Sequence, residues 1–179
     1  MWKLLGVFLT LGGVGGILYS WVMEQKDRQM RVDVFLLFLQ KSLSVMKSEK
    51  IIVATYFQRV IEQDMFFQNP KNEILHRTLE EIIRRLSLHT YPSGQMVWEE
   101  VLREKEQDWN LDKETFETLV QAGNGFFGRS REENIRFLNK SIEDLEQHQV
   151  RLKEKSVQER KVWIPVGMLG SIMLVILFL

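Results

Sequence analysis

The amino-acid sequence predicts an all-α protein: a cytoplasmic bundle of about six helices, whose first and last helices continue into two transmembrane spans. Two long uncharged segments occupy the ends of the 179-residue chain. Between them, apolar residues recur at intervals of three and four, which is the spacing of one helix face. No run of alternating polar and apolar residues is long enough to predict a strand. A chain of this length accommodates one modest core, which argues against a two-domain enzyme.

Charge and cysteine content exclude several classes of function. The 24 Lys and Arg residues balance 24 Asp and Glu residues, and the chain has no Cys. Nucleic-acid binding draws its affinity from a basic excess that displaces counterions from phosphates, so we expect no nucleic-acid partner. Without cysteine there are no disulfides, no thiolate catalysis and no Cys-based zinc sites within the chain.

The two end segments have the length and composition of membrane helices. From Leu4 to Met23 and from Val162 to Leu179 the chain carries no charged residue. Each run is long enough to cross a hydrocarbon core of about 30 Å. We expect transmembrane helices at residues 2–23 and 162–179, with a helical bundle at 24–161 between them. A buried core helix remains the alternative for either segment, and a secretory signal peptide is a further alternative for the first.

Basic residues beside the two segments predict their orientation, because cytoplasmic flanks carry the excess of Lys and Arg. Only Lys3 lies on the outer side of either segment. The inner flanks carry Lys26, Arg28 and Arg31, then Arg151, Lys153, Lys155, Arg160 and Lys161. We therefore expect both termini outside and residues 24–161 in the cytoplasm.

Small residues in the two segments are candidates for close helix packing. Gly12 and Gly16 form a Gly-xxx-Gly pair in the first segment, and Gly167 and Gly170 lie in the second, after Pro165. Such residues let two helix backbones approach each other within a membrane. The pattern fits packing of one span on the other, and it also fits a homo-oligomer contact.

The middle of the chain divides into amphipathic helices at its breakers. Apolar stripes run through residues 24–48 and 51–66, and Asn69-Pro70 then predicts a cap and the first position of another helix. That helix ends at Tyr91-Pro92-Ser93-Gly94, and a short helix follows to about Gln107. The predicted core positions of these helices are Val32, Phe35 or Leu36, Leu39, Leu43, Met46, Val53, Phe57, Val60, Ile61, Met65, Leu75, Leu79, Ile82, Ile83, Leu86, Val97, Trp98, Val101 and Leu102.

The last two bundle helices are predicted from their caps. Asn110 is the expected cap of a helix that carries Phe116, Leu119 and Val120. Ser130 with Glu133 is a capping box. It opens a helix expected to run from about 131 to the C-terminus.

Glycines at 123, 125 and 128 form the most suggestive local motif. Gly123 to Gly128 fits G-x-G-x-x-G, and the segment misses a P-loop because Arg129 stands where that motif has Lys. Both phosphate motifs follow a strand, whereas the residues before Gly123 have a helical pattern. We expect a helix-to-helix turn in which Gly supplies positive φ and permits close approach.

The remaining chemistry-bearing residues predict no catalytic, cofactor or metal site. Glu73 and His76 match one Glu-x-x-His element, but a di-iron bundle needs two such elements and two further carboxylates. His89 lies in a segment whose sequence predicts a loop, and His148 has no His or Glu at ligand spacing along its helix. Trp98 and Trp109 are expected in the core or at its rim. We predict no enzyme activity, no cofactor and no small-molecule substrate.

Three stretches give the chain a family resemblance. They are Met1-Trp2-Lys3-Leu4-Leu5-Gly6 at the start, the Leu119 to Gly128 turn followed by Ser130, and Lys161 to Gly170 running into an Ile/Leu-rich end. In these residues and in its layout, the chain resembles the stage III sporulation protein AB family of endospore-forming bacteria. The resemblance implies a fold similar to the cytoplasmic domain of the inner-membrane platform protein of type II secretion and type IV pilus systems.

The resemblance also implies a function. The family is expected in the mother-cell membrane around the forespore, as a non-catalytic scaffold of the channel that joins the two cells. Its expected partners are a secretion-type ATPase of the same apparatus and other channel membrane proteins. Because platform proteins often meet their motors through charged faces, the basic residues Arg84, Arg85, Arg103 and Lys105 are docking candidates. The alternatives are a general membrane-anchored adaptor and a membrane enzyme with an unrecognised site.

Overall fold

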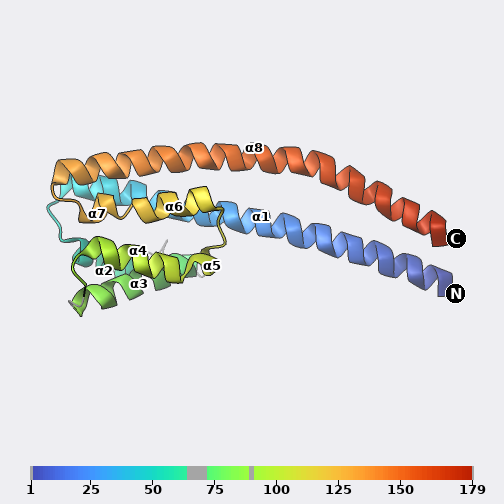
Figure 1. Cartoon of the computed structure of the whole chain (residues 1–179), viewed down its shortest axis with the longest axis horizontal. Helices are drawn as coiled ribbons and strands as arrows, with labels where there is room; N and C mark the ends of the chain where they lie inside the picture. The colour runs from blue at the N-terminus through green and yellow to red at the C-terminus, as the bar shows by residue number, and fades with distance from the viewer. Residues whose placement is uncertain (1, 64–71, 89–90, 179) are drawn as a thin grey trace. The chain divides into compact units, whose positions relative to one another are not determined.

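The computed structural model describes residues 2–63, 72–88 and 91–178, and over these residues the protein is all-α. The predicted helical bundle is confirmed. The helices are α1 (Trp2–Ser48), α2 (Val53–Gln63), α3 (Glu73–Ser87), α4 (Gly94–Glu104), α5 (Glu106–Trp109), α6 (Lys113–Gln121), α7 (Asn124–Phe127) and α8 (Arg131–Phe178) (Figure 1).

The chain forms two units. One comprises Met30–Gln149 and holds the bundle, and the other comprises Met1–Gln29 with Val150–Leu179. Within the described part of the chain, the structure contains no helix that is both long enough and apolar enough to cross a membrane.

The long helices begin and end where the sequence predicts. α1 continues through residue 24 to Ser48 without a break, and α8 continues from Arg131 through Pro165 to Phe178. The predicted single helix from Gly94 to about Gln107 is wrong, because Lys105 leaves helical geometry (φ −101°, ψ 11°) and separates α4 from α5. The predicted cap at Asn69-Pro70 and the predicted core position Met65 lie outside the described residues.

The cap of α6 differs from the prediction. Asp112, not Asn110, caps this helix: the Asp112 carboxylate accepts hydrogen bonds from the Thr115 backbone N–H (3.0 Å) and hydroxyl (2.8 Å). Asn110 instead ends α5 in the left-handed conformation, with φ 45°. Asn tolerates this conformation better than most residues, so its presence marks a helix end as readily as a helix start.

Aromatic side chains from α1, α2, α4, α5, α6 and α7 fill the core of the bundle. The ring centroid of Phe126 lies 5.0 Å from that of Phe57, 5.2 Å from that of Trp98 and 5.6 Å from that of Phe38. Trp98 and Trp109 are fully buried, which confirms their predicted place in the core. The Trp98 indole N–H donates to the Leu119 carbonyl at 3.1 Å and so ties α4 to α6.

Two arginines cap the ends of neighbouring helices. The Arg31 guanidinium donates to the carbonyls of Asp108 (2.9 Å) and Trp109 (2.8 Å) at the end of α5. The Arg131 guanidinium donates to the carbonyls of Met46 (2.8 Å) and Lys47 (2.7 Å) in the last turn of α1. Cations in these positions satisfy carbonyls that have no partner within their helix and complement the helix dipole.

Candidate functional site

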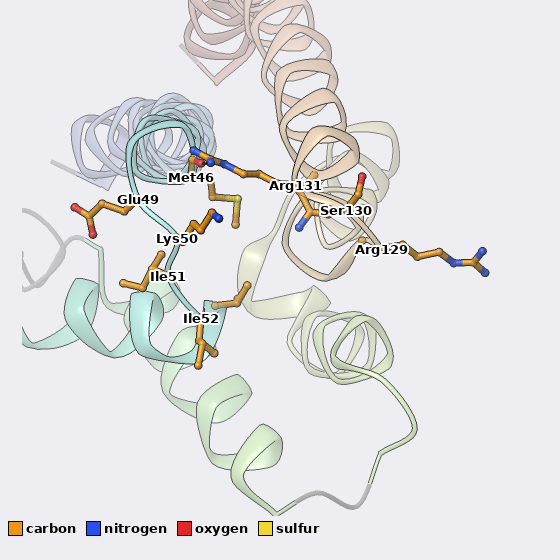
Figure 2. Close-up of a pocket in the computed structure, with 11 residues that line it drawn as sticks. Met46, Glu49, Lys50, Ile51, Ile52, Arg129, Ser130 and Arg131 are labelled. Atoms are coloured by element: carbon orange, nitrogen blue, oxygen red, sulfur yellow. Dashed lines mark hydrogen bonds between the residues drawn. The ribbon is translucent and has the colours of Figure 1, made fainter.

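A groove lies at one end of the bundle, between the α1–α2 connection and the α7–α8 connection (Figures 1 and 2). Its volume is about 450 Å³, and it opens to solvent. The lining residues are Met46, Glu49, Lys50, Ile51, Ile52, Val53, Gly128, Arg129, Ser130, Arg131 and Asn134. Figure 2 shows Arg131 reaching from the start of α8 across to the end of α1 beside Met46, while Arg129 points outward.

Capping interactions fix the wall of the groove that α8 contributes. The Ser130 hydroxyl accepts a hydrogen bond from the Glu133 backbone N–H at 3.2 Å, as the capping box predicts. The Glu133 carboxylate accepts from the Arg129 backbone N–H at 3.1 Å. Arg129 and Ser130 therefore lie on a backbone held at both ends of the turn, even though both side chains are exposed.

Close packing explains the three glycines of the predicted turn. A Cβ atom at Gly125 would lie 2.6 Å from Leu138 Cγ, and one at Gly123 or Gly128 would clash with Trp98 or Asn134. The expected positive φ is wrong, because the described glycines all have φ outside the left-handed region. The segment between Gly123 and Gly128 forms the short helix α7. The three glycines leave space for neighbouring side chains and do not adopt an unusual backbone conformation.

The charged face of α3 and α4 contains the predicted docking residues. Arg85 Nε lies 2.6 Å from Glu81 Oε1, and Arg85 Nη1 lies 3.3 Å from Glu100 Oε1 and 3.1 Å from Glu104 Oε1. Only 14% of the Arg85 side chain is exposed. Arg84 also binds Glu81, at 2.6 Å, but 60% of its side chain is exposed.

The other two docking candidates make contacts of their own. Arg103 joins α4 to α6 through Glu117 (3.0 Å) and also binds Glu99 (3.0 Å). Lys105 Nζ is 3.5 Å from the Arg77 carbonyl. The structure thus brings Arg84 and Arg85 together around one carboxylate, while Arg103 belongs to a second ion-pair group.

These ion pairs shift the pKa values of their carboxyl groups. Hydrogen bonds from Arg84, followed by those from Arg85, lower the pKa of Glu81 to about 2, although partial burial opposes the shift. A hydrogen bond from Arg103 lowers the pKa of Glu117. Both carboxylates therefore bind their arginines over the whole neutral range.

The lowered pKa of Glu81 predicts a stability that depends on pH. Because the folded pKa lies below the usual 4.5, the ion pairs stabilise the fold above pH 4.5, and this contribution disappears as the pH falls toward 2. Replacing Glu81 with Gln should cost about 1 kcal/mol at pH 7, since the pairs are partly solvated. We expect the difference in free energy of unfolding from wild type to shrink by pH 3.

Urea unfolding at the two pH values measures this difference. Glu132→Gln is the matched control, because Glu132 is an exposed carboxylate in the first turn of α8. A Glu81→Gln difference that is unchanged between pH 7 and pH 3 would contradict the assignment.

The histidines do not form a metal site in the described residues. Glu73 binds Arg77, while His76 Nδ1 lies 3.6 Å from Glu80 Oε2, so the Glu-x-x-His element is not assembled. Within residues 2–63, 72–88 and 91–178, no group of three or more metal-ligating side chains is present. His89 lies outside the described residues.

Buried His148 has a partner that sequence spacing did not reveal. Its Nε2 lies 3.1 Å from Glu114 Oε1 and its Nδ1 lies 3.5 Å from the Thr115 hydroxyl, so it joins α8 to the start of α6. The search along the helix missed this contact because the carboxylate comes from a different helix.

The glycines of the end segments lie in the second unit. A Cβ added at Gly16 or Gly170 would meet no heavy atom within 4 Å. The side-chain surroundings of Gly12 and Gly167 lie outside what the structure describes. Helix packing through these four positions stays a prediction.

A comparison with known families decides the classification. The family model of stage III sporulation protein AB matches residues 3–179. The chain belongs to this family. It is therefore a sporulation-associated protein, and the sequence resemblance is confirmed.

A solved structure has a similar fold. It is described as stage III sporulation protein AB (SpoIIIAB), and it matches this chain with a TM-score of 0.59 at 17% sequence identity. The match covers 73% of this chain and 97% of the other. The comparison with curated proteins gave no match. At this identity, the structural likeness supports the helical fold of the family.

The groove is the site that sequence reasoning missed. Its two walls come from segments about 80 residues apart, 46–53 and 128–134. The first segment has no motif of its own, and the capping box of the second indicates only the start of a helix. One signal was present in the sequence: Ile51-Ile52 is an apolar pair in a connection between helices, where polar turn residues are usual.

Proposed function

We propose that this protein is a non-catalytic membrane platform of the channel apparatus between mother cell and forespore, and that it docks the secretion-type ATPase of that apparatus. The observation that carries the proposal is the family match over residues 3–179. The packed aromatic core agrees with a scaffold, because its interior is filled by Trp98, Phe57, Phe126 and their neighbours.

The proposed location is the mother-cell membrane around the forespore. Uncharged runs at 4–23 and 162–179 support attachment there, and residues 4–23 lie within α1 and residues 162–178 within α8. The basic inner flanks support two spans with both termini outside and the bundle in the cytoplasm. Further channel membrane proteins would then meet the spans, with Gly12, Gly16, Gly167 and Gly170 as the candidate contact points.

The charged face of α3 and α4 is the proposed docking surface for the ATPase. The side chain of Arg84 is 60% exposed, and Lys105 follows the last turn of α4. Arg85 and Arg103 contribute mainly to the stability of the fold, because their ion pairs hold α3 to α4 and α4 to α6. A partner that docks here would therefore meet Arg84 and Lys105 on a surface that Arg85 and Arg103 keep rigid.

Capture of the ATPase by the full-length protein in detergent tests this proposal. Arg84→Ala should weaken capture about fivefold, which corresponds to about 1 kcal/mol for one rim charge. Arg59→Ala is the matched control, because Arg59 lies on a different helix, α2, has a side chain that is 43% exposed and also binds one glutamate. We expect the control to retain wild-type capture.

The outcomes distinguish an error in the location of the docking site from an error in the proposed docking of the ATPase. Equal capture by wild type, Arg84→Ala and Arg59→Ala would move the docking site elsewhere on the bundle. Failure of the wild-type protein to capture the ATPase would contradict the platform role.

A further inference from the structure

We propose that the groove at the α1–α2 and α7–α8 connections binds a short segment of a partner protein, in which apolar side chains are flanked by carboxylates. This surface is separate from the charged face of α3 and α4. The inference does not require that the partner be the ATPase.

The α1–α2 connection contributes most of the apolar surface of the groove. Ile52 lies at the rim with 75% of its surface exposed, and Ile51, Val53 and Met46 continue an aliphatic wall into the groove. A partner that covered Ile52 would remove its apolar surface from water, which favours association. The groove volume of about 450 Å³ lies in the range of sites that hold a few side chains.

The residues around this aliphatic wall give the groove a positive charge. Three lining residues are basic: Lys50, Arg129 and Arg131. The one lining carboxylate, Glu49, is bound to Arg59 at 2.9 Å and so does not neutralise them. Arg131 donates to backbone carbonyls, which leaves its net charge in place.

Lys50 and Arg129 of the groove differ from the three arginines among the docking candidates. Arg84, Arg85 and Arg103 each bind carboxylates of the same chain. Lys50 and Arg129 are exposed and form no ion pair with any residue that the structure describes. In a chain of zero net charge, cations that remain unpaired beside exposed aliphatic residues favour an anionic, partly apolar partner.

Among anionic partners, an acidic peptide fits this combination. Carboxylates would meet Lys50 and Arg129 at the rim, while an apolar side chain covers Ile52 and enters the groove. Recognition of acidic motifs by clustered basic residues is a common mode of peptide binding. A nucleic acid would need a longer basic track and would leave the aliphatic wall uncovered.

Selection from a displayed library of random twelve-residue peptides tests the inference. The library is panned on the full-length protein in detergent, and in parallel on the double variant Lys50→Glu with Arg129→Glu. We expect peptides enriched in Asp or Glu beside Leu, Ile or Phe on the wild-type protein, and no such enrichment on the variant. A selected peptide should bind the double variant at least tenfold more weakly.

Two further variants separate the groove from general charge effects. Lys113→Glu with Lys140→Glu makes the same change in charge at two exposed positions that do not line the groove, and it should bind the peptide as the wild type does. Ile52→Asp should weaken binding several-fold, because it places a charge in the apolar wall. All three substituted positions, Lys113, Lys140 and Ile52, are exposed, so the core remains intact.

The inference fails if the selected peptides are basic or uncharged, or if they bind the groove variant and the wild type equally. It also fails if no peptide is enriched in a manner that depends on Lys50 and Arg129. Displacement of the selected peptide by millimolar glycerol phosphate would assign the groove to a phosphate group in place of an acidic peptide.

Discussion

Replacing Trp98 with alanine is expected to lower the free energy of unfolding by about 3 to 5 kcal/mol, the usual cost of removing a large aromatic side chain from a core. Trp98 is fully buried and lies 5.2 Å from Phe126 and 6.1 Å from Phe57, centroid to centroid. The substitution leaves a cavity at the contact of α2, α4 and α7. A loss of this size is a large share of the 5 to 15 kcal/mol that stabilises a typical domain.

Urea unfolding followed by circular dichroism measures the loss. Trp98→Phe should cost less than the alanine substitution, although it leaves the Leu119 carbonyl without the indole donor. Trp109→Phe is a matched control, because the Trp109 indole N–H has no hydrogen-bond partner among the described residues. If Trp98→Ala costs less than 1 kcal/mol, the rings around Trp98 do not form the stabilising centre of the bundle.

The second large effect is expected at Gly125. Gly125→Ala should destabilise the fold by about 1 to 3 kcal/mol, the usual cost of overpacking a core. The added Cβ would lie 2.6 Å from Leu138 Cγ and 3.0 Å from the Leu138 backbone nitrogen, so α7 and α8 must separate. The backbone atom matters most, because it cannot turn away as a side chain can.

Thermal unfolding of Gly125→Ala and Gly13→Ala gives the comparison. A Cβ at Gly13 would meet no atom within 4 Å, so this control should leave the midpoint close to that of wild type. Equal midpoints for the two variants would contradict the close approach of α7 and α8.

Helix positions were predictable because periodicity records which face is buried. Leu75, Leu79 and Ile82 were assigned to the core from spacing alone and are fully buried, whereas Ile83 and Leu86 of the same stripe are only partly buried. The unbroken courses of α1 and α8 followed from the absence of Pro and Gly breakers within the bundle.

Contacts between distant segments were not predictable in this way. Asn110 and Asp112 are both good caps, and only the geometry shows that Asp112 receives the Thr115 N–H. Glu114 meets His148 across two helices, and the groove joins segments that have no motif in common. The glycines at 123, 125 and 128 were placed in the correct segment, and their predicted role in close packing is confirmed, whereas the positive φ also expected of them is absent.

The central claim, a membrane platform whose bundle faces the cytoplasm, is tested most directly by cysteine labelling in intact sporulating cells. The chain has no cysteine, so a single introduced cysteine reports its own location. Gln107→Cys lies in the bundle at an exposed position, and Trp2→Cys lies at the proposed outer end of the first span. We predict that a maleimide that cannot cross membranes labels Trp2→Cys once it has access to the outer face of the mother-cell membrane, and labels Gln107→Cys only after lysis. Labelling of Gln107→Cys without lysis, or recovery of the wild-type protein in the soluble fraction after lysis, would contradict the account.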